Sequence, residues 1–292
     1  MPTSSTSPTR PPVTFPTAGP IDLAVEVQVG ALKVVAGDRE DTVVTVLPTD
    51  PDREADRRTA EGTRVELDGD RLTVVTPKPR FSLVGPGESV DVRVELPSGS
   101  RLSAEVALGA VRSSGRLGAT RVKASSGRAQ LGTTGDLWLR AGHGPVTVEA
   151  ADGTVEIIAD HGQIKVGRLG GDALLKASHG SVAVGESTGD LEAKLSYGDL
   201  EVTRALGSVT ARTAYGSIAL HEVSSGAVEA ESGYGEVSVG VRDGVAAWLD
   251  LASKNGRVRN ELDADRAPGE SEQAVAVRVR TQFGDVSVRR AS

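Results

Sequence analysis

One stretch of the sequence reads Gly189-Asp-Leu-Glu-Ala-Lys-Leu-Ser-Tyr-Gly-Asp-Leu-Glu-Val-Thr-Arg-Ala-Leu206, two segments of nine residues that both begin with Gly-Asp-Leu-Glu. In each segment, apolar residues stand two and four places after the glycine, and polar residues stand between them. Such alternation between glycines is typical of a half-buried β-strand followed by a tight turn. The stretch therefore predicts one short strand and one turn in every nine residues.

The same spacing of glycines extends over much of the chain. Of fifteen successive intervals, thirteen are nine residues long, one is eight and one is ten. Self-similarity at a fixed period identifies a repeat protein. The glycines that carry the period are Gly109, Gly118, Gly127, Gly135, Gly144, Gly153, Gly162, Gly171, Gly180, Gly189, Gly198, Gly207, Gly216, Gly226, Gly235 and Gly244.

Two types of nine-residue segment alternate, which gives a longer period of 18 residues. Two strands and two turns per period predict one coil of a flattened parallel solenoid, with coils stacked at about 4.8 Å. Antiparallel hairpins would also give the nine-residue spacing, but identity is higher at 18 residues than at nine. We therefore predict an all-β, single-stranded, right-handed parallel β-solenoid, the hand following from strand twist and parallel connections.

The alternation also predicts which side chains fill the interior. One wall should be aliphatic and the facing wall should carry smaller residues, so that large and small side chains fill a narrow core. The aliphatic set is Val146, Val148, Ile164, Val166, Val182, Val184, Ile218, Leu220, Val237 and Val239, and the small set includes Ala159, Ala177, Ala193 and Ala211.

Outside the regular repeats, the chain divides by composition. Residues 1–20 are rich in Ser, Thr and Pro and predict a disordered tail. Residues 21–108 predict an irregular β cap continuous with the solenoid, with a helical turn at 53–59. Residues 109–292 predict the solenoid and a C-terminal cap that includes an acidic loop at 263–273. Irregular ends protect the unpaired backbone of a terminal coil.

Several segments carry a family resemblance. They are Gly198-Asp-Leu-Glu-Val202, Val90-Asp-Val-Arg-Val-Glu-Leu-Pro-Ser-Gly99 and Phe283-Gly-Asp-Val-Ser-Val288. Together they resemble the bacterial DUF4097 family, also called the "putative adhesin" or β-strand-repeat family. Ala246-Ala-Trp-Leu-Asp-Leu251 and Gly256-Arg-Val-Arg-Asn-Glu-Leu262 are similar to its actinobacterial members. The resemblance implies a right-handed β-solenoid without known catalysis and an adhesin-like role.

Composition excludes several classes of function. The chain has no cysteine, so disulfide scaffolds, thiolate metal sites and cysteine catalysis are excluded. It has no stretch of about 20 apolar residues for a membrane span, and its first 20 residues lack the features of a secretory signal, so we expect a cytoplasmic protein. The net charge of -7 argues against a nucleic-acid partner. Nucleotide-loop and serine-hydrolase motifs are missing, so we expect no enzyme and no cofactor.

One position of the repeat gathers the aromatic and imidazole side chains. It holds all three tyrosines and three of the four histidines: His143, His161, His179, Tyr197, Tyr215 and Tyr234, followed by Asn255 and Phe283. We interpret it as a structural ladder at a turn, stacked at the strand spacing. The alternative is a metal site formed by the three histidines with Asp152 or Asp160, which parallel side chains disfavour because zinc needs convergent ligands. Three stacked imidazoles also predict sensitivity to acid.

A second position predicts a row of cations. It holds Lys123, Arg140, Ile158, Lys176, Lys194, Arg212 and Glu231. Such a row could bind an anionic polymer. The alternative is a solvated face of mixed charge, because Glu156, Glu192 and Glu229 stand two places earlier on the same side.

These features predict a non-enzymatic scaffold or binding protein that presents a repetitive surface to a protein or polymer partner. The first alternative is a self-assembling scaffold of cytoskeletal type, for which bare apolar terminal coils would argue. A polysaccharide-processing enzyme fits less well, because nine-residue segments leave no room for loops that could form a catalytic cleft.

Overall fold

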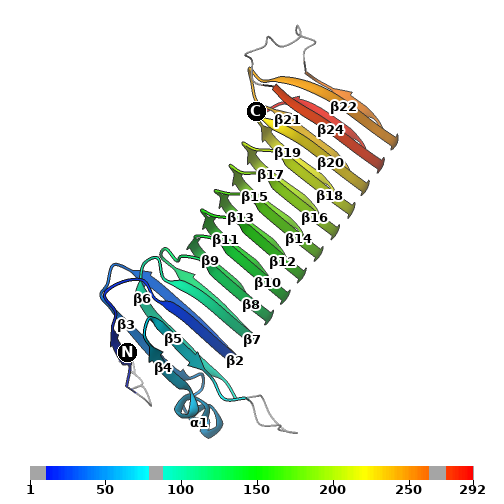
Figure 1. The fold of residues 1–292 in the computed structure, drawn as a ribbon. Helices are drawn as coiled ribbons and strands as arrows, with labels where there is room; N and C mark the ends of the chain where they lie inside the picture. The colour runs from blue at the N-terminus through cyan, green and yellow to red at the C-terminus, as the bar shows by residue number, and fades with distance from the viewer. Residues whose placement is uncertain (1–10, 79–87, 263–273, 292) are drawn as a thin grey trace, which may run out of the picture. The chain divides into compact units, whose positions relative to one another are not determined.

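The computed structural model describes residues 11–78, 88–262 and 274–291 of the chain (Figure 1). Contacts within the chain divide it into two compact units, Met1–Arg140 and Ala141–Ser292. The acidic loop predicted at residues 263–273 and the first half of the predicted tail lie outside the described residues.

The first unit consists of β-strands and one short helix. Its elements are β1 (Val13–Pro16), β2 (Asp22–Gly37), β3 (Asp41–Pro48), α1 (Glu54–Gly62), β4 (Arg64–Asp68), β5 (Arg71–Val75), β6 (Val90–Pro97), β7 (Arg101–Ser114), β8 (Thr120–Ser126) and β9 (Ala129–Thr134). Strand β10 (Leu137–His143) contains the division between the units.

Two long strands of the first unit, β2 and β7, each form a whole coil. They pair in parallel along their length, beginning with Asp22 opposite Arg101. Each contains a glycine with positive φ near its middle, Gly30 in β2 and Gly109 in β7. On the other side of β2, β5 pairs with its first part and β6 with its second part. β7 pairs in the same way with β8 and β9, so successive coils change direction at the same corner.

The beginning of the first unit departs from parallel stacking. β3 pairs antiparallel with both β1 and β6, and β4 pairs antiparallel with β5. This arrangement is the irregular β cap that the sequence predicts, and α1 confirms the helical turn expected at residues 53–59. Among the described residues, no helix is long and apolar enough to cross a membrane.

The prediction of a disordered tail over residues 1–20 is wrong for part of its length. Val13–Pro16 form β1, whose backbone pairs antiparallel with β3. Val13 and Phe15 are half-buried and alternate with exposed neighbours. Pro16 ends the strand, a position at which proline removes no hydrogen bond from the centre of the sheet. Composition alone indicated disorder, but four alternating residues are sufficient to add an edge strand.

The second unit continues as a series of short strands. They are β11 (Val146–Ala151), β12 (Val155–His161), β13 (Ile164–Leu169), β14 (Ala173–His179), β15 (Val182–Ser187), β16 (Leu191–Tyr197), β17 (Leu200–Ala205), β18 (Val209–Tyr215), β19 (Ile218–Val223), β20 (Gly226–Tyr234), β21 (Val237–Val241), β22 (Ala246–Asn255), β23 (Val258–Asn260), β24 (Ala274–Phe283) and β25 (Val286–Arg290).

Strands of the second unit pair in parallel with the strand two places further along the chain. Leu191 of β16 lies opposite Val209 of β18, and Leu200 of β17 lies opposite Ile218 of β19. From β11 to β19, residues one coil apart differ by 18 in sequence, as for Asp172 and Asp190. Even-numbered strands therefore form one wall of the solenoid and odd-numbered strands form the other. The predicted parallel β-solenoid is confirmed, and antiparallel hairpins are excluded for these strands.

The stacking order differs from the chain order at the far end of the second unit. β24 pairs with β20 on one side and with β22 on the other. In the same way, β25 lies between β21 and β23. Figure 1 shows β24, in red, between the strands labelled β20 and β22. The later coil is therefore inserted between two earlier ones.

The core is aliphatic, as the alternation predicts. All the predicted inward residues of both walls in the second unit are buried. The facing wall is not uniformly small, however, because Ile157 and Leu175 are also fully buried there. In β16, Leu191 and Leu195 flank Ala193 along one strand. Large and small inward side chains thus alternate within β16, and the even-numbered wall as a whole mixes large and small residues.

The corner between the two walls requires glycine. Gly180 and Gly198 have φ values of 144° and 139°, which side chains with a Cβ rarely adopt. A Cβ on Gly180 would overlap the carbonyl oxygen of Gly162, one coil away. The same overlap would occur in the first unit between Gly127 and Gly109. The repeating glycine therefore permits both the turn and the close approach of neighbouring coils.

The coil formed by β22 and β23 has no further coil stacked on it among the described residues. Its inward residues Leu249 and Leu251 are only half-buried, and Val258 is 46% exposed. Their neighbours one coil away, Val277 and Val279, are fully buried. The last stacked coil thus contributes less apolar burial than the coils beneath it.

Replacing a corner glycine is expected to weaken coil stacking. Gly180→Ala should lower the free energy of unfolding by about 3 kcal/mol, because a Cβ there meets both an unfavourable φ and the backbone of Gly162. Urea unfolding followed by circular dichroism measures this change. Gly37→Ala is the control, because a Cβ there has nothing within 4 Å, and it should change stability by less than about 0.5 kcal/mol. Equal stability of the two variants would contradict the corner constraint.

Candidate functional site

The outer face of the even-numbered wall carries the polar side chains that the sequence singles out. Because its strands pair in parallel without offset within the repeat, one position in each strand forms a row across the wall. Lys194 of β16 therefore lies between Lys176 of β14 and Arg212 of β18. Tyr197 lies between His179 and Tyr215 in the same way.

The aromatic and imidazole side chains form a continuous ring column. Its members in the second unit are His143, His161, His179, Tyr197, Tyr215, Tyr234 and Phe283. From His179 to Phe283, neighbouring rings are stacked with centroids 4.8–5.1 Å apart and planes within 8° of parallel. The three histidines instead meet edge to face at 4.7 Å.

The ring column faces solvent at the ends of the strands. Tyr197, Tyr215 and Tyr234 are 47–49% exposed, so the rings contact one another and do not cover the core. Tyr234 lies between two rings because β24 places Phe283 beside it. The column is therefore longer than the histidines and tyrosines alone indicate.

The three histidines are not arranged around a common point. Their rings follow one another along the column, and Nδ1 of His161 lies 2.9 Å from the carbonyl oxygen of Asp160. Within the described ranges, no group of three or more His, Asp or Glu side chains could hold a metal ion. The fourth histidine, His221, lies on the opposite wall, 3.0 Å from Glu201.

A cation row runs parallel to the ring column. In the second unit it consists of Lys176, Lys194 and Arg212, then Glu231, then Arg280. Three like charges thus lie directly opposite one another on consecutive strands, an arrangement that is destabilising by itself. Sequence reasoning missed Arg280. This residue lies next to Glu231 because β24, and not β22, pairs with β20.

Two of the predicted cations lie in the first unit. Lys123 forms an ion pair with Glu105 at 2.6 Å, and Arg140 is the last residue of that unit. In the second unit, Ile158 of β12 occupies the row before Lys176. The five predicted cations therefore do not form one uninterrupted row.

Acidic side chains accompany the cation row. Lys194 contacts Glu192 at 2.5 Å, and Arg212 contacts Glu231 at 3.2 Å. Arg280 contacts Asp250 at 2.6 Å. All these side chains are 41–55% exposed, and ion pairs at such exposure contribute little to stability.

These contacts shift the titration of the acids. The hydrogen bond from Lys194 lowers the pKa of Glu192, with smaller contributions from the charges of Lys176 and Arg212. The hydrogen bond from Arg280 lowers the pKa of Asp250. The cations of the row therefore already stabilise negative charge beside them.

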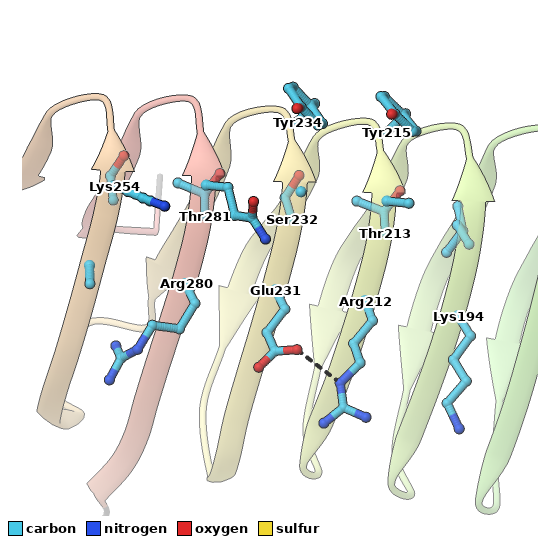
Figure 2. Close-up of a pocket in the computed structure, with 16 residues that line it drawn as sticks. Lys194, Arg212, Thr213, Tyr215, Glu231, Ser232, Tyr234, Lys254, Arg280 and Thr281 are labelled. Carbon is cyan, nitrogen blue, oxygen red and sulfur yellow. Dashed lines mark ion pairs between the residues drawn. The ribbon is translucent and has the colours of Figure 1, made fainter.

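The cation row and the ring column border a shallow groove of about 910 Å³. Figure 2 shows Lys194, Arg212, Glu231 and Arg280 projecting from neighbouring strands, with Tyr215 and Tyr234 along the other side. Lys254 of β22 adds a further cation. The complete lining is Lys194, Leu195, Arg212, Thr213, Ala214, Tyr215, Glu231, Ser232, Gly233, Tyr234, Ala252, Ser253, Lys254, Arg280, Thr281 and Gln282.

The serine and threonine hydroxyl groups of the groove are engaged with the backbone. Thr213 donates a hydrogen bond to the carbonyl of Gly198 at 3.2 Å, and Ser232 donates to that of Gly216 at 2.9 Å. Both side chains are at most 5% exposed. These hydroxyls connect adjacent coils, so they are not available to a ligand in the way that the exposed charged side chains and tyrosines are.

The opposite wall arranges its charges differently. Arg168, Glu186, Arg204 and Glu222 lie opposite one another in that order on consecutive strands. Arg204 contacts Glu186 at 2.7 Å. Alternating charges compensate one another within the wall. Sequence reasoning missed this ladder, although the spacing of 18 residues between its members is a signal that could have revealed it. The cation row has no such alternation from Lys176 to Arg212.

Comparison with known proteins gives one family match. A family model described as Toastrack DUF4097 matches residues 22–289. No curated protein matches the chain.

Several solved structures are similar to the chain. A "putative adhesin" from Bacteroides fragilis is 10% identical with a TM-score of 0.35, over 96% of this chain and 98% of that one. A "putative adhesin" from Parabacteroides merdae is 12% identical with a TM-score of 0.32, over 97% and 96%. A "putative lipid binding protein" from Parabacteroides distasonis is 12% identical with a TM-score of 0.28, over 96% and 95%. TM-scores this low support no inference about ligands.

Each ring of the ring column is expected to stabilise the second unit by an amount that increases with the number of rings stacked against it. Tyr215→Ala removes two stacked contacts and should lower the free energy of unfolding by about 2 kcal/mol. Phe283→Ala removes one and should lower it by about 1 kcal/mol. Urea unfolding measures both changes. If neither variant is destabilised, the column is an exposed row of side chains without a structural role.

Acid is expected to destabilise the second unit through Glu192 and Asp250. Their pKa values lie below the ordinary 4.5 and 3.8 in the folded state. Such a group contributes stability that is fully present above its unfolded pKa and is lost as pH falls through its folded pKa. The urea midpoint should fall below about pH 4.5, and less steeply in Glu192→Gln/Asp250→Asn. An acid profile unchanged by these substitutions would assign the dependence to other groups.

Proposed function

This chain belongs to the Toastrack DUF4097 family, and from that premise and the groove we propose that it is a non-enzymatic solenoid that binds an extended anionic polymer. The polymer would lie across the even-numbered wall, along the cation row and beside the ring column. Each coil would supply one contact, and successive contacts would be separated by the strand spacing of about 4.8 Å.

One observation supports this proposal most strongly, the like-charge sequence Lys176, Lys194 and Arg212 on consecutive strands. Mutual repulsion of these side chains is relieved when an anion lies along them. A polymer with regularly spaced carboxylate, sulfate or phosphate groups would provide one anion for each cation. The alternating charges of the opposite wall, such as Glu186 and Arg204, would offer the same polymer no net attraction.

The existing ion pairs of the row would not prevent binding. Glu192 and Glu231 are half-exposed, and their contacts with Lys194 and Arg212 are of the kind that water and other anions readily replace. Linked anions on one polymer would compete effectively, because binding of the first raises the local concentration of the others. Affinity would therefore depend on polymer length.

The groove suits binding better than catalysis. The hydroxyl groups of Thr213 and Ser232 donate to backbone carbonyls and are buried, which is unfavourable for a nucleophile. The exposed groups are cations separated by one coil each, an arrangement that repeats contacts and does not converge on one reacting atom.

Two other expectations from the sequence remain predictions. Self-assembly would use the half-buried last coil, and sedimentation at several protein concentrations would detect it. The cytoplasmic location would be tested by fractionation of cells that produce the chain.

We expect the protein to bind polygalacturonate but not neutral dextran, with affinity that falls as salt rises. Lys194→Gln/Arg212→Gln should weaken binding about tenfold, because two of the like charges are removed. Isothermal titration calorimetry measures both affinities. Polyphosphate and single-stranded DNA in the same assay distinguish the class of anion, and we expect the DNA to bind more weakly because of the net charge of -7.

Two variants serve as controls for this experiment. Lys165→Gln removes an exposed cation from the opposite wall and should leave affinity unchanged. Glu231→Gln removes a competing acid from the groove and should strengthen binding several-fold. If Lys165→Gln weakens binding as much as the groove variant does, attraction is diffuse and the groove proposal is wrong.

A further inference from the structure

A second site lies on the same wall, at the opposite end of the strands from the ring column. Trp248 of β22 is 63% exposed, the highest exposure among the large apolar side chains of the described residues. The other tryptophan, Trp138, is half-buried and has the guanidinium of Arg121 3.7 Å from its ring centre. Trp248 has no such ring or cation partner among the described residues.

The neighbours of Trp248 leave room beside its ring. Ala276 of β24 lies directly opposite it, and Ala227 of β20 lies one coil further. Two small side chains in succession create a depression of about 290 Å³ next to the indole. Its lining also includes parts of Val228, Leu249 and Val277.

Charged side chains border this depression in the next row along the strands. Arg278 lies between Glu229 and Asp250, 3.9 Å from the first and 3.3 Å from the second. Asp250 is also held by Arg280. Two carboxylates and one guanidinium are thus fixed beside an exposed aromatic face, which provides both acceptors and donors.

We propose that this depression binds one uncharged pyranose ring of a carbohydrate. The axial C–H groups of a pyranose carry partial positive charge and stack favourably on the negative face of an indole. Its equatorial hydroxyls can donate to Glu229 and Asp250 and accept from Arg278. The volume lies at the lower limit of small-molecule sites, which corresponds to a single sugar ring.

Charge favours a neutral sugar over an anionic ligand at this site. Arg278 and Arg280 only balance Glu229 and Asp250, so the border of the depression offers phosphate or carboxylate groups no net attraction. A nucleobase could stack on the indole, but its phosphate would meet the same carboxylates. The site is therefore chemically distinct from the cation row, and its test does not depend on polymer binding.

The two tryptophans of the chain allow a direct test by fluorine NMR. Protein labelled with 5-fluorotryptophan should give two resonances, assigned with Trp138→Phe and Trp248→Phe. Methyl glycosides of glucose, galactose and mannose, and N-acetylglucosamine, are titrated at millimolar concentrations. We expect at least one to shift the Trp248 resonance saturably and to leave the Trp138 resonance in place. The corresponding oligosaccharide should bind no more than about threefold more tightly, because the site holds one ring.

Matched variants test the polar border of the site. Saturation-transfer NMR, which observes the sugar, should lose its signal in Trp248→Ala. Glu229→Gln should weaken binding at least threefold, whereas Glu156→Gln, in the same row but distant along the wall, should not. Circular dichroism verifies that each variant is folded.

Several results would overturn the proposal. They are the absence of a shift with every sugar, an equal shift of both tryptophan resonances, and equal effects of Glu229→Gln and Glu156→Gln. Tighter binding of uridine monophosphate than of any sugar would assign the site to nucleotides. An oligosaccharide that binds tenfold more tightly than its single ring would exclude a one-ring site.

Discussion

The close approach of backbone to backbone at the corner glycines is the constraint on which the molecule depends. At Gly180, and at its equivalents in neighbouring coils, the space for a Cβ is already occupied by the carbonyl of the previous coil. This proximity lets hydrogen bonds form between coils on both walls with a nearly constant register, which shifts between β19 and β21 after Leu220. Every row of side chains described above is a consequence of that register, because a slip in one coil would displace all its outward residues.

The two walls show that one backbone register permits opposite electrostatic arrangements. On the odd-numbered wall, Arg168, Glu186 and Arg204 alternate in sign, and the stacking of coils itself satisfies their charges. On the even-numbered wall, Lys194 and Arg212 face each other with the same sign. Since both walls share the same spacing, the difference reflects the choice of side chains and not the backbone geometry. That choice leaves like charges side by side on the even-numbered wall, and the proposed polymer binding rests on them.

Local patterns made much of this fold predictable, whereas relations between coils did not. Glycine spacing and apolar alternation are properties of nine or 18 consecutive residues, and they correctly indicated parallel coils and the buried aliphatic residues. The stacking order was hidden because every coil offers nearly the same edge, so nothing local distinguishes β24 from β22 as the neighbour of β20. Arg280 joined the cation row only through that order, whereas Phe283 was predicted in the ring column but its place between Tyr234 and Asn255 was not. Likewise, β1 is stabilised by its partner β3 and not by its own composition.

The insertion of β24 and β25 has a consequence for synthesis on the ribosome. A growing chain presents β22 to the edge of β20 before β24 has been made, yet in the folded protein β24 occupies that edge. Strands that emerge first usually fold first. Here the earlier strand must remain undocked, or be displaced, until residues 274–290 are available. The regular coils can therefore fold one after another as the chain is synthesised. The insertion of β24 and β25 between the two earlier coils can only take place after residues 274–290 have been translated.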